Sequence, residues 1–106
     1  MSPWAWLALA GAAEVAWSQS IRPTEGFTRL GPTVLCVVLA LAAIYPLTRA
    51  MQGLPVGTAY VVFTGIGGLG AVALGVALAG DPLTLARAAG VALVVAGVAT
   101  LRAAGG

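Results

Sequence analysis

Glu14 is the residue in this chain best suited to chemistry, because it is an acidic side chain inside a long apolar stretch. That stretch runs from Trp4 to Ile21 and carries no other charge. A charged side chain at mid-membrane depth is costly, and such residues usually mark a pathway for ions or protons. A structural Glu would need a basic partner, yet no Arg lies at mid-depth in any apolar segment. The position therefore predicts a site for protons or an organic cation, and not for an anion.

Residues spaced three, four or seven positions from Glu14 form one face of the first segment. That face should point inward, because a Glu facing lipid would lack hydrogen-bonding partners. If a dimer brings two copies of Glu14 together, their titrations become coupled. The members of this face are Leu7, Ala10, Gly11, Glu14, Trp17, Ser18 and Ile21.

A second candidate face lies on the third apolar segment, where Tyr60, Phe63, Thr64 and Gly67 share helical spacing. Tyr and Phe rings can flank a cation, and each such contact contributes about 0.5–2 kcal/mol. From spacing alone, ordinary aromatic packing explains this face better than a cation site does.

Glycines suggest where helices bend or touch. Residues 64–70 contain four glycines, which weaken a helix and permit a bend. Gly65 and Gly67 are therefore candidate hinge residues, although small residues equally allow close helix contact in membranes. In the fourth segment Gly90 and Gly97 share one face, which favours a dimer contact; packing within one subunit is the alternative.

Composition places these residues in a membrane protein. The 106 residues are 60% hydrophobic and 8% charged, whereas soluble domains carry roughly 25% charged residues. Four apolar segments are each close to the roughly 20 residues that span a bilayer as a helix. We expect one domain over residues 1–106, an all-α membrane protein with four transmembrane helices. The segments run about Trp4–Ile21, Pro32–Thr48, Gly57–Ala79 and Leu83–Leu101.

The helix ends carry their own signals. Gly80 suits the position just after a helix, and Pro82 suits the start of the next one. The first segment lacks a positively charged leader region and is interrupted by Glu14. It is therefore expected to be a helix of the mature protein and not a signal peptide.

Charge and cysteine content exclude several function classes. The net charge is +2, all five basic residues are Arg, and no basic block carries interleaved aromatics, so nucleic-acid binding has little support. The single cysteine, Cys36, and the absence of His leave no metal-ligand spacing. We expect no metal and no cofactor, and a packing role for Cys36.

The arginines are almost evenly divided between the two expected membrane faces. Arg22, Arg29 and Arg87 fall on one side, and Arg49 and Arg102 on the other. The positive-inside rule needs a bias, so the chain can insert either way up, unless one Arg suffices to fix its topology. Larger transporters contain two inverted repeats. Here no internal repeat is visible, and an oppositely oriented second copy would supply the missing half.

Together these residues resemble the small multidrug resistance family of membrane transporters. The length, the four spans and Glu14 match over almost the whole chain, and Phe63–Ala71 is most similar to the guanidinium-exporter branch. The resemblance implies proton-coupled export of small organic cations by antiparallel dimers in the cytoplasmic membrane. It implies Glu14 as the shared proton and substrate site, lined by Trp17 and Tyr60. The matching motifs are Gly26-Phe-Thr-Arg29, Pro55-Val-Gly-Thr-Ala-Tyr60 and the Gly90/Gly97 pair.

Two positions depart from the family pattern. Phe63 stands where a Trp is usual, and Ala43 stands where a Ser commonly supports the central Glu. Both changes remove hydrogen-bond donors, whereas a planar guanidinium needs fixed, directional partners. The site is expected to be more apolar and to accept bulkier or alkylated cations; alternatively, the chain works in a heterodimer with a paralogue.

We therefore predict a transporter, not an enzyme, that exchanges protons for guanidinium or substituted guanidinium compounds across the inner membrane. Its partners are the bilayer, the cation and a second copy in an antiparallel homodimer. The alternatives are a promiscuous quaternary-ammonium exporter and a heterodimer subunit. A rotor-type proton-translocating subunit is usually a two-helix hairpin, and a non-transporting assembly subunit would make Glu14 dispensable.

Overall fold

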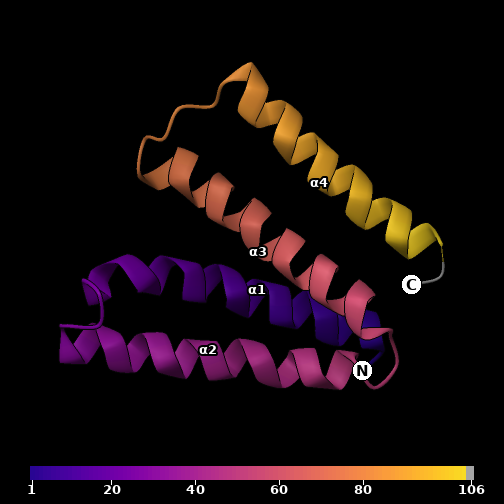
Figure 1. Cartoon of the computed structure of the whole chain (residues 1–106), viewed down its shortest axis with the longest axis horizontal. Helices are drawn as coiled ribbons and strands as arrows, with labels where there is room; N and C mark the ends of the chain where they lie inside the picture. The colour runs from indigo at the N-terminus through magenta and orange to yellow at the C-terminus, as the bar shows by residue number, and fades with distance from the viewer. Residues whose placement is uncertain (105–106) are drawn as a thin grey trace.

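The computed structural model describes residues 1–104, which form four α-helices joined by short connections (Figure 1). A short 3-10 helix, Arg22–Thr24, follows the first helix. The predicted all-α class is confirmed. The helices are α1 (Pro3–Ile21), α2 (Leu30–Ala50), α3 (Val56–Leu78) and α4 (Leu85–Ala103).

Within the described residues, three helices are long and apolar enough to cross a membrane: α2, α3 and α4. Of the four predicted transmembrane helices, three are therefore confirmed as long and apolar enough to span a membrane. α1 has 19 residues, or about 28 Å at 1.5 Å per residue, close to the roughly 30 Å hydrocarbon core. Its hydropathy is lowered by the polar side chains of Glu14, Ser18, Gln19 and Ser20.

The connection between α3 and α4 corrects one predicted helix start. Ala79 is the C-cap residue of α3, and Gly80 follows it with a φ of 70°. The predicted position of Gly80 just after the helix is therefore confirmed. Pro82 does not begin α4, because Thr84 caps that helix instead. The Thr84 hydroxyl oxygen accepts a hydrogen bond from the Arg87 backbone N–H at 3.2 Å, which satisfies a free donor of the first turn.

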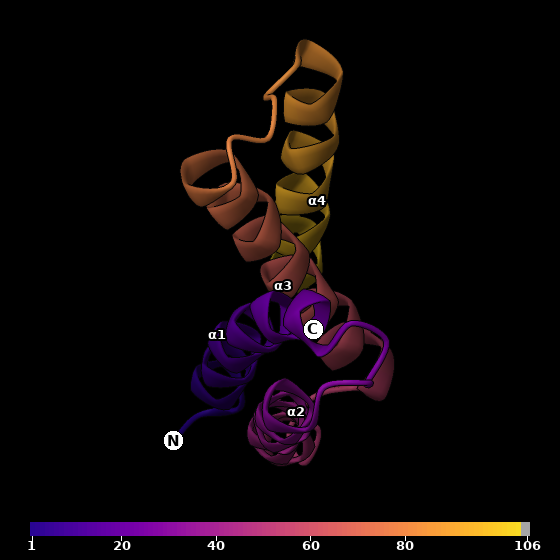
Figure 2. The same ribbon diagram turned by 90° about the vertical axis from the view of Figure 1, so that its left-hand side faces the viewer.

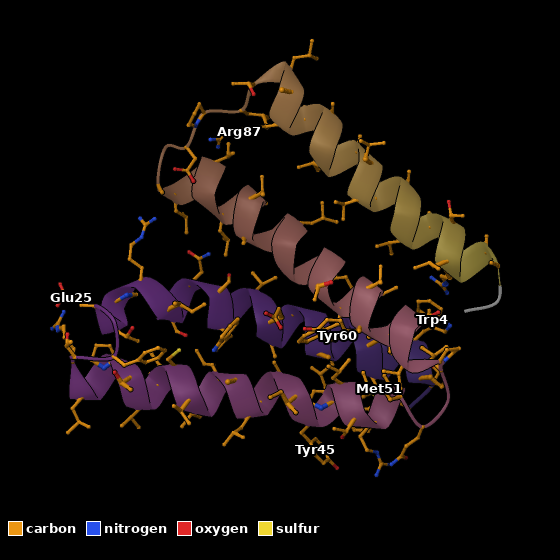
Figure 3. All side chains as sticks on the ribbon, in the orientation of Figure 1. Trp4, Glu25, Tyr45, Met51, Tyr60 and Arg87 are labelled. Atoms are coloured by element: carbon orange, nitrogen blue, oxygen red, sulfur yellow. The ribbon has the colours of Figure 1, made fainter. Side chains whose placement is uncertain are left out.

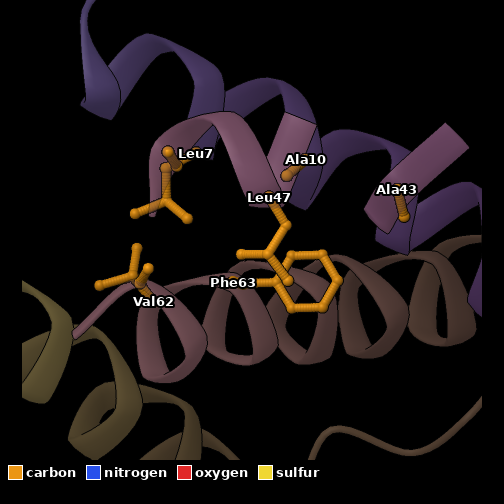
Figure 4. Packing of buried hydrophobic residues seen from close by; sticks show 8 residues of the cluster. Leu7, Ala10, Ala43, Leu47, Val62 and Phe63 are labelled. Atoms are coloured by element: carbon orange, nitrogen blue, oxygen red, sulfur yellow. The ribbon is translucent and has the colours of Figure 1, made fainter. Parts of the chain in front are cut away.

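The core lies where the first three helices meet. α1 packs against both α2 and α3, and the side chains of all three converge there (Figure 4). The backbone of α4 comes close only to that of α3 among the described helices, and most of α4 stands away from α1 and α2 (Figure 2). No residue of α4 is buried, so a single copy leaves this helix largely uncovered. The buried apolar cluster consists of Leu7, Ala10, Ala43, Leu47, Ala50, Ala59, Val62 and Phe63.

Two arginine–tryptophan contacts hold the end of the molecule at which α1 begins. The Arg49 guanidinium lies 5.3 Å from the centre of the Trp6 ring, and Arg102 lies 5.4 Å from Trp4. Such exposed cation–π contacts contribute about 0.5–1 kcal/mol each. They place the two arginines at the same end, as the sequence predicted, and attach the last turn of α4 to α1.

Candidate functional site

Glu14 lies directly against α3 at Gly67. The Cγ atom of Glu14 occupies the space that a β-carbon at position 67 would need. Val15 fills the corresponding space at Gly70, and Ile66 fills the one at Gly11. The two helices therefore interlock at glycines, and the predicted inward orientation of Glu14 is confirmed.

The Glu14 carboxylate forms no hydrogen bond and no ion pair within residues 1–104. Its side chain is half-buried, and its neighbours on the same face, Leu7 and Ala10, are fully buried. The helices thus fix the carbon chain of Glu14 and leave its oxygens available. Such a group can hold a proton or pair with a cation, and it has nothing to attract an anion.

The other predicted site residues fall into two environments. Ala43 and Phe63 belong to the apolar core, with exposed fractions of 2% and 6%. Tyr60 is 55% exposed, and its ring centre lies 6.2 Å from that of Phe63. Trp17 is half-buried on α1, one turn beyond Glu14.

A single copy does not gather Trp17 and Tyr60 around Glu14. α1 and α3 run in the same direction (Figure 1). Tyr60 lies seven residues before Gly67, or about 10 Å back along α3, while Trp17 lies about 4.5 Å forward along α1. The two aromatic residues therefore flank Glu14 at different depths. The two cavities described below are lined by other residues.

The candidate hinge glycines lie in an uninterrupted helix. α3 is continuous from Val56 to Leu78. A β-carbon at position 65 would meet Cγ2 of Val98 at 3.0 Å, and one at position 67 would overlap Glu14. Both glycines thus allow close approach of a neighbouring helix, and bending at these positions stays a prediction.

An apolar groove of about 760 Å³ lies between α3 and α4. Gly90 and Gly97, the predicted dimer contact, both line it. A β-carbon at either position would meet nothing within 4 Å, so neither glycine is in close contact within the subunit. The groove is therefore an open surface in one copy.

A polar cavity of about 600 Å³ lies near the other end of α1, between its last turn and the end of α3. It is lined by residues that include Arg22, Glu25, Arg29 and Asp81. Nε of Arg29 lies 3.9 Å from Oε2 of Glu25, and both side chains are exposed. The sequence indicated Arg22 and Arg29 only as charges on one membrane face and Arg29 as part of a family motif, and it assigned no role to Glu25 or Asp81.

Comparison with known proteins decides the family. The family model described as Small Multidrug Resistance protein matches residues 2–94. The chain belongs to this family. It is 41% identical over 99 residues to a guanidinium exporter of Yersinia pseudotuberculosis serotype I (strain IP32953), covering 93% of this chain and 95% of that protein. It is 42% identical over 99 residues to a guanidinium exporter of Citrobacter freundii, covering 93% and 94%.

Membership confirms the resemblance found in the sequence. With its long apolar helices, this small multidrug resistance protein is a multi-pass membrane protein. Two features of its site were not visible in the sequence. The contact of Glu14 with Gly67 needed the relative placement of two helices, and the polar cavity needed the fold of two loops. The only available signal was that Glu14 lay on a face predicted to point inward, and that Gly67 shared a helical face with Tyr60 and Phe63.

Proposed function

We propose that this small multidrug resistance protein is a proton-coupled antiporter that exports guanidinium or substituted guanidinium compounds across the inner membrane. The observation that carries the proposal is the Glu14 carboxylate, which is packed against α3 and has no partner of its own within residues 1–104. The relatives named guanidinium exporters support the class of substrate. A lone carboxylate in a membrane helix fits transport better than catalysis.

Exchange follows from competition for one negative charge. A protonated Glu14 cannot pair with a cation, and a Glu14 paired with a guanidinium has no need of a proton. Carboxylate–guanidinium pairs are strong because two N–H groups donate in parallel. Protons entering on one side therefore displace the cation, and the proton gradient drives its export.

A second copy completes the site. Within one copy Tyr60 is 55% exposed, Trp17 lies at a different depth, and no residue of α4 is buried. The groove that contains Gly90 and Gly97 is unobstructed at both glycines, where a helix of a partner would pack. We infer an antiparallel homodimer, because the arginines divide three to two between the two faces and leave little orientation bias.

We expect the site to favour substituted cations over bare guanidinium, because Phe63 and Ala43 supply none of the donors of the family pattern. Ala43 and Phe63 lie in the apolar core, and neither side chain has a hydrogen-bond donor. Burying apolar ligand surface contributes on the order of 25 cal/mol per Å². The same observation supports the second candidate function, export of small quaternary ammonium compounds.

Replacing the carboxylate tests the proposal. Glu14→Gln keeps nearly the same shape and removes the charge, so it should fold and lose both cation binding and coupled uptake. The measurement is proton release from detergent-solubilised protein on adding guanidinium, phenylguanidinium or tetrapropylammonium, followed by proton-driven uptake into proteoliposomes. Glu25→Gln is the matched control, because that carboxylate is exposed and paired with Arg29. Wild-type uptake by Glu14→Gln would refute the mechanism.

The orientation of the copies is tested by labelling from each side of the membrane. A cysteine placed at the C-terminus, in a variant without Cys36, should react partly from one side and partly from the other. The near-even arginine distribution is the physical reason. Reaction from one side alone would reject dual topology and favour a heterodimer with an oppositely oriented partner.

A further inference from the structure

The polar cavity lies at the end of the molecule where α1 and α2 are joined. Figure 1 shows α1 and α3 diverging toward this end, and Figure 3 shows Glu25 there, far from Trp4. The cavity measures about 600 Å³ and lies between the last turn of α1 and the loop after α3. Its charged lining residues are Arg22, Glu25, Arg29 and Asp81.

Asp81 is held in this cavity by the backbone. Gly80 has a φ of 70° and reverses the chain, and the Asp81 backbone N–H donates to the Gly75 carbonyl oxygen at 3.1 Å. This turn lays the Asp81 carboxylate over Gly75, where its Oδ2 occupies the space of a β-carbon. No ion pair or side-chain hydrogen bond of Asp81 is formed within residues 1–104. The carboxylate is therefore positioned but unpaired.

Asp81 and Glu14 lie along the same strip of α3. Gly67, Ala71 and Gly75 follow one another at four-residue spacing; Glu14 covers the first and Asp81 covers the last. Eight residues of helix separate these two glycines by about 12 Å along the axis. Ala71 and Ser18, each one turn beyond the Glu14 contact, both line the cavity. The cavity thus reaches from Asp81 to within one turn of Glu14.

Among the charged residues that line the cavity, Asp81 is the one that attracts a cation. Glu25 is 3.9 Å from Arg29, so that pair largely offsets itself. Arg22 also lines the cavity and has the same sign as the substrate. A cation in the cavity is therefore attracted by Asp81 and repelled by Arg22.

We propose that Asp81 captures the organic cation at the mouth of this cavity before the cation moves to Glu14. The inference rests on the proposed function, since it assumes that Glu14 is the cation site. A carboxylate in a cleft raises the local cation concentration and the rate of association. The same stopping point also serves the departing cation. At about 12 Å Asp81 is beyond the roughly 10 Å screening length at 0.1 M salt, so the equilibrium affinity at Glu14 stays nearly constant.

The test is rapid mixing of the solubilised protein with phenylguanidinium, followed through proton release or tryptophan fluorescence. Asp81→Asn removes the charge with little change of shape. We expect the association rate constant to fall about 3- to 10-fold at low ionic strength. At 0.1 M salt, where the roughly 12 Å separation exceeds the screening length, Kd should equal that of the wild type. At 1 M salt, where screening acts over about 3 Å, the difference in association rate should vanish. Glu25→Gln, which removes a paired carboxylate from the same cavity, should bind at the wild-type rate.

Arg22→Gln provides a second variant in case the Asp81 turn is disturbed. Removing the repelling charge should speed association, again only at low salt. Wild-type rates in Asp81→Asn, equal slowing in Asp81→Asn and Glu25→Gln, or no acceleration in Arg22→Gln would each overturn the capture role. These outcomes are separable from failure of the proposed function, which would appear as cation binding that survives Glu14→Gln.

Discussion

Glycines on the two sides of α3 have different surroundings. Toward α1, Gly67 and Gly70 are filled by the side chains of Glu14 and Val15. Toward α4, a β-carbon at Gly65 would meet Val98 at 3.0 Å, but one at Gly68, or at Gly90 on α4, would meet nothing within 4 Å. One interface is closed by the chain itself, and the other is open along a groove of about 760 Å³.

The difference shows that what fills the space beside a glycine determines its role. Where a functional side chain fills it, the glycine sets the position of that side chain. Where nothing fills it, the glycine leaves space for a group from elsewhere. Helices in membranes associate through such small residues because they allow close approach. The closed interface accordingly positions the candidate site, and the open one is suited to a second copy.

The largest expected effect comes from closing the space that Glu14 uses. In Gly67→Ala the new methyl group overlaps Cγ of Glu14 and lies 3.2 Å from its Cβ, so the whole side chain must move. Overpacking of this kind typically costs about 1–3 kcal/mol. We expect at least a tenfold loss of cation affinity, equivalent to about 1.4 kcal/mol, measured by proton release.

Gly31→Ala is the matched control for this change. It adds the same methyl group on α2, at a position outside both cavities where nothing lies within 4 Å. Alanine also favours the helix by about 1 kcal/mol over glycine. Wild-type affinity is expected. Equal affinities in the two variants would mean that the contact with Gly67 does not position Glu14.

The sequence predicted the elements better than their contacts. Apolar segments of about 20 residues were enough to place all four helices within about two residues of their observed ends. Glu14 stood out because charge is rare in such segments. The prediction that Pro82 begins the fourth helix was wrong. Thr84, two residues later, caps the helix with its side chain, and Thr is a preferred residue at that position.

The sequence could not assign roles to individual glycines or loop charges. Gly65 and Gly67 matched a hinge pattern, yet which residues they touch depends on helix rotation and translation. Asp81 and Arg22 lie 59 residues apart in the chain and line one cavity only because two loops meet at one end. Periodicity defines faces within one helix and contains no information about which faces meet.

The last expected effect, which tests the open interface, is a weaker association between copies. Gly97→Leu places a larger side chain in the groove, and the first atom of that side chain meets nothing within 4 Å in one copy. If a partner helix occupies the groove, Leu excludes it. The dimer dissociation constant should rise about tenfold, which corresponds to about 1.4 kcal/mol. Energy transfer between labelled copies at increasing detergent-to-protein ratios measures this constant.

The control for Gly97→Leu is Gly31→Leu on α2, at a position that is also unobstructed and lies outside the groove. Both substitutions replace glycine by a better helix former, so neither weakens the helix that carries it. A loss of dimer affinity limited to Gly97→Leu therefore has to arise from the groove. If the two variants dimerise equally well, the groove is not the contact between copies, and the Gly90/Gly97 face has to be assigned to some other neighbour.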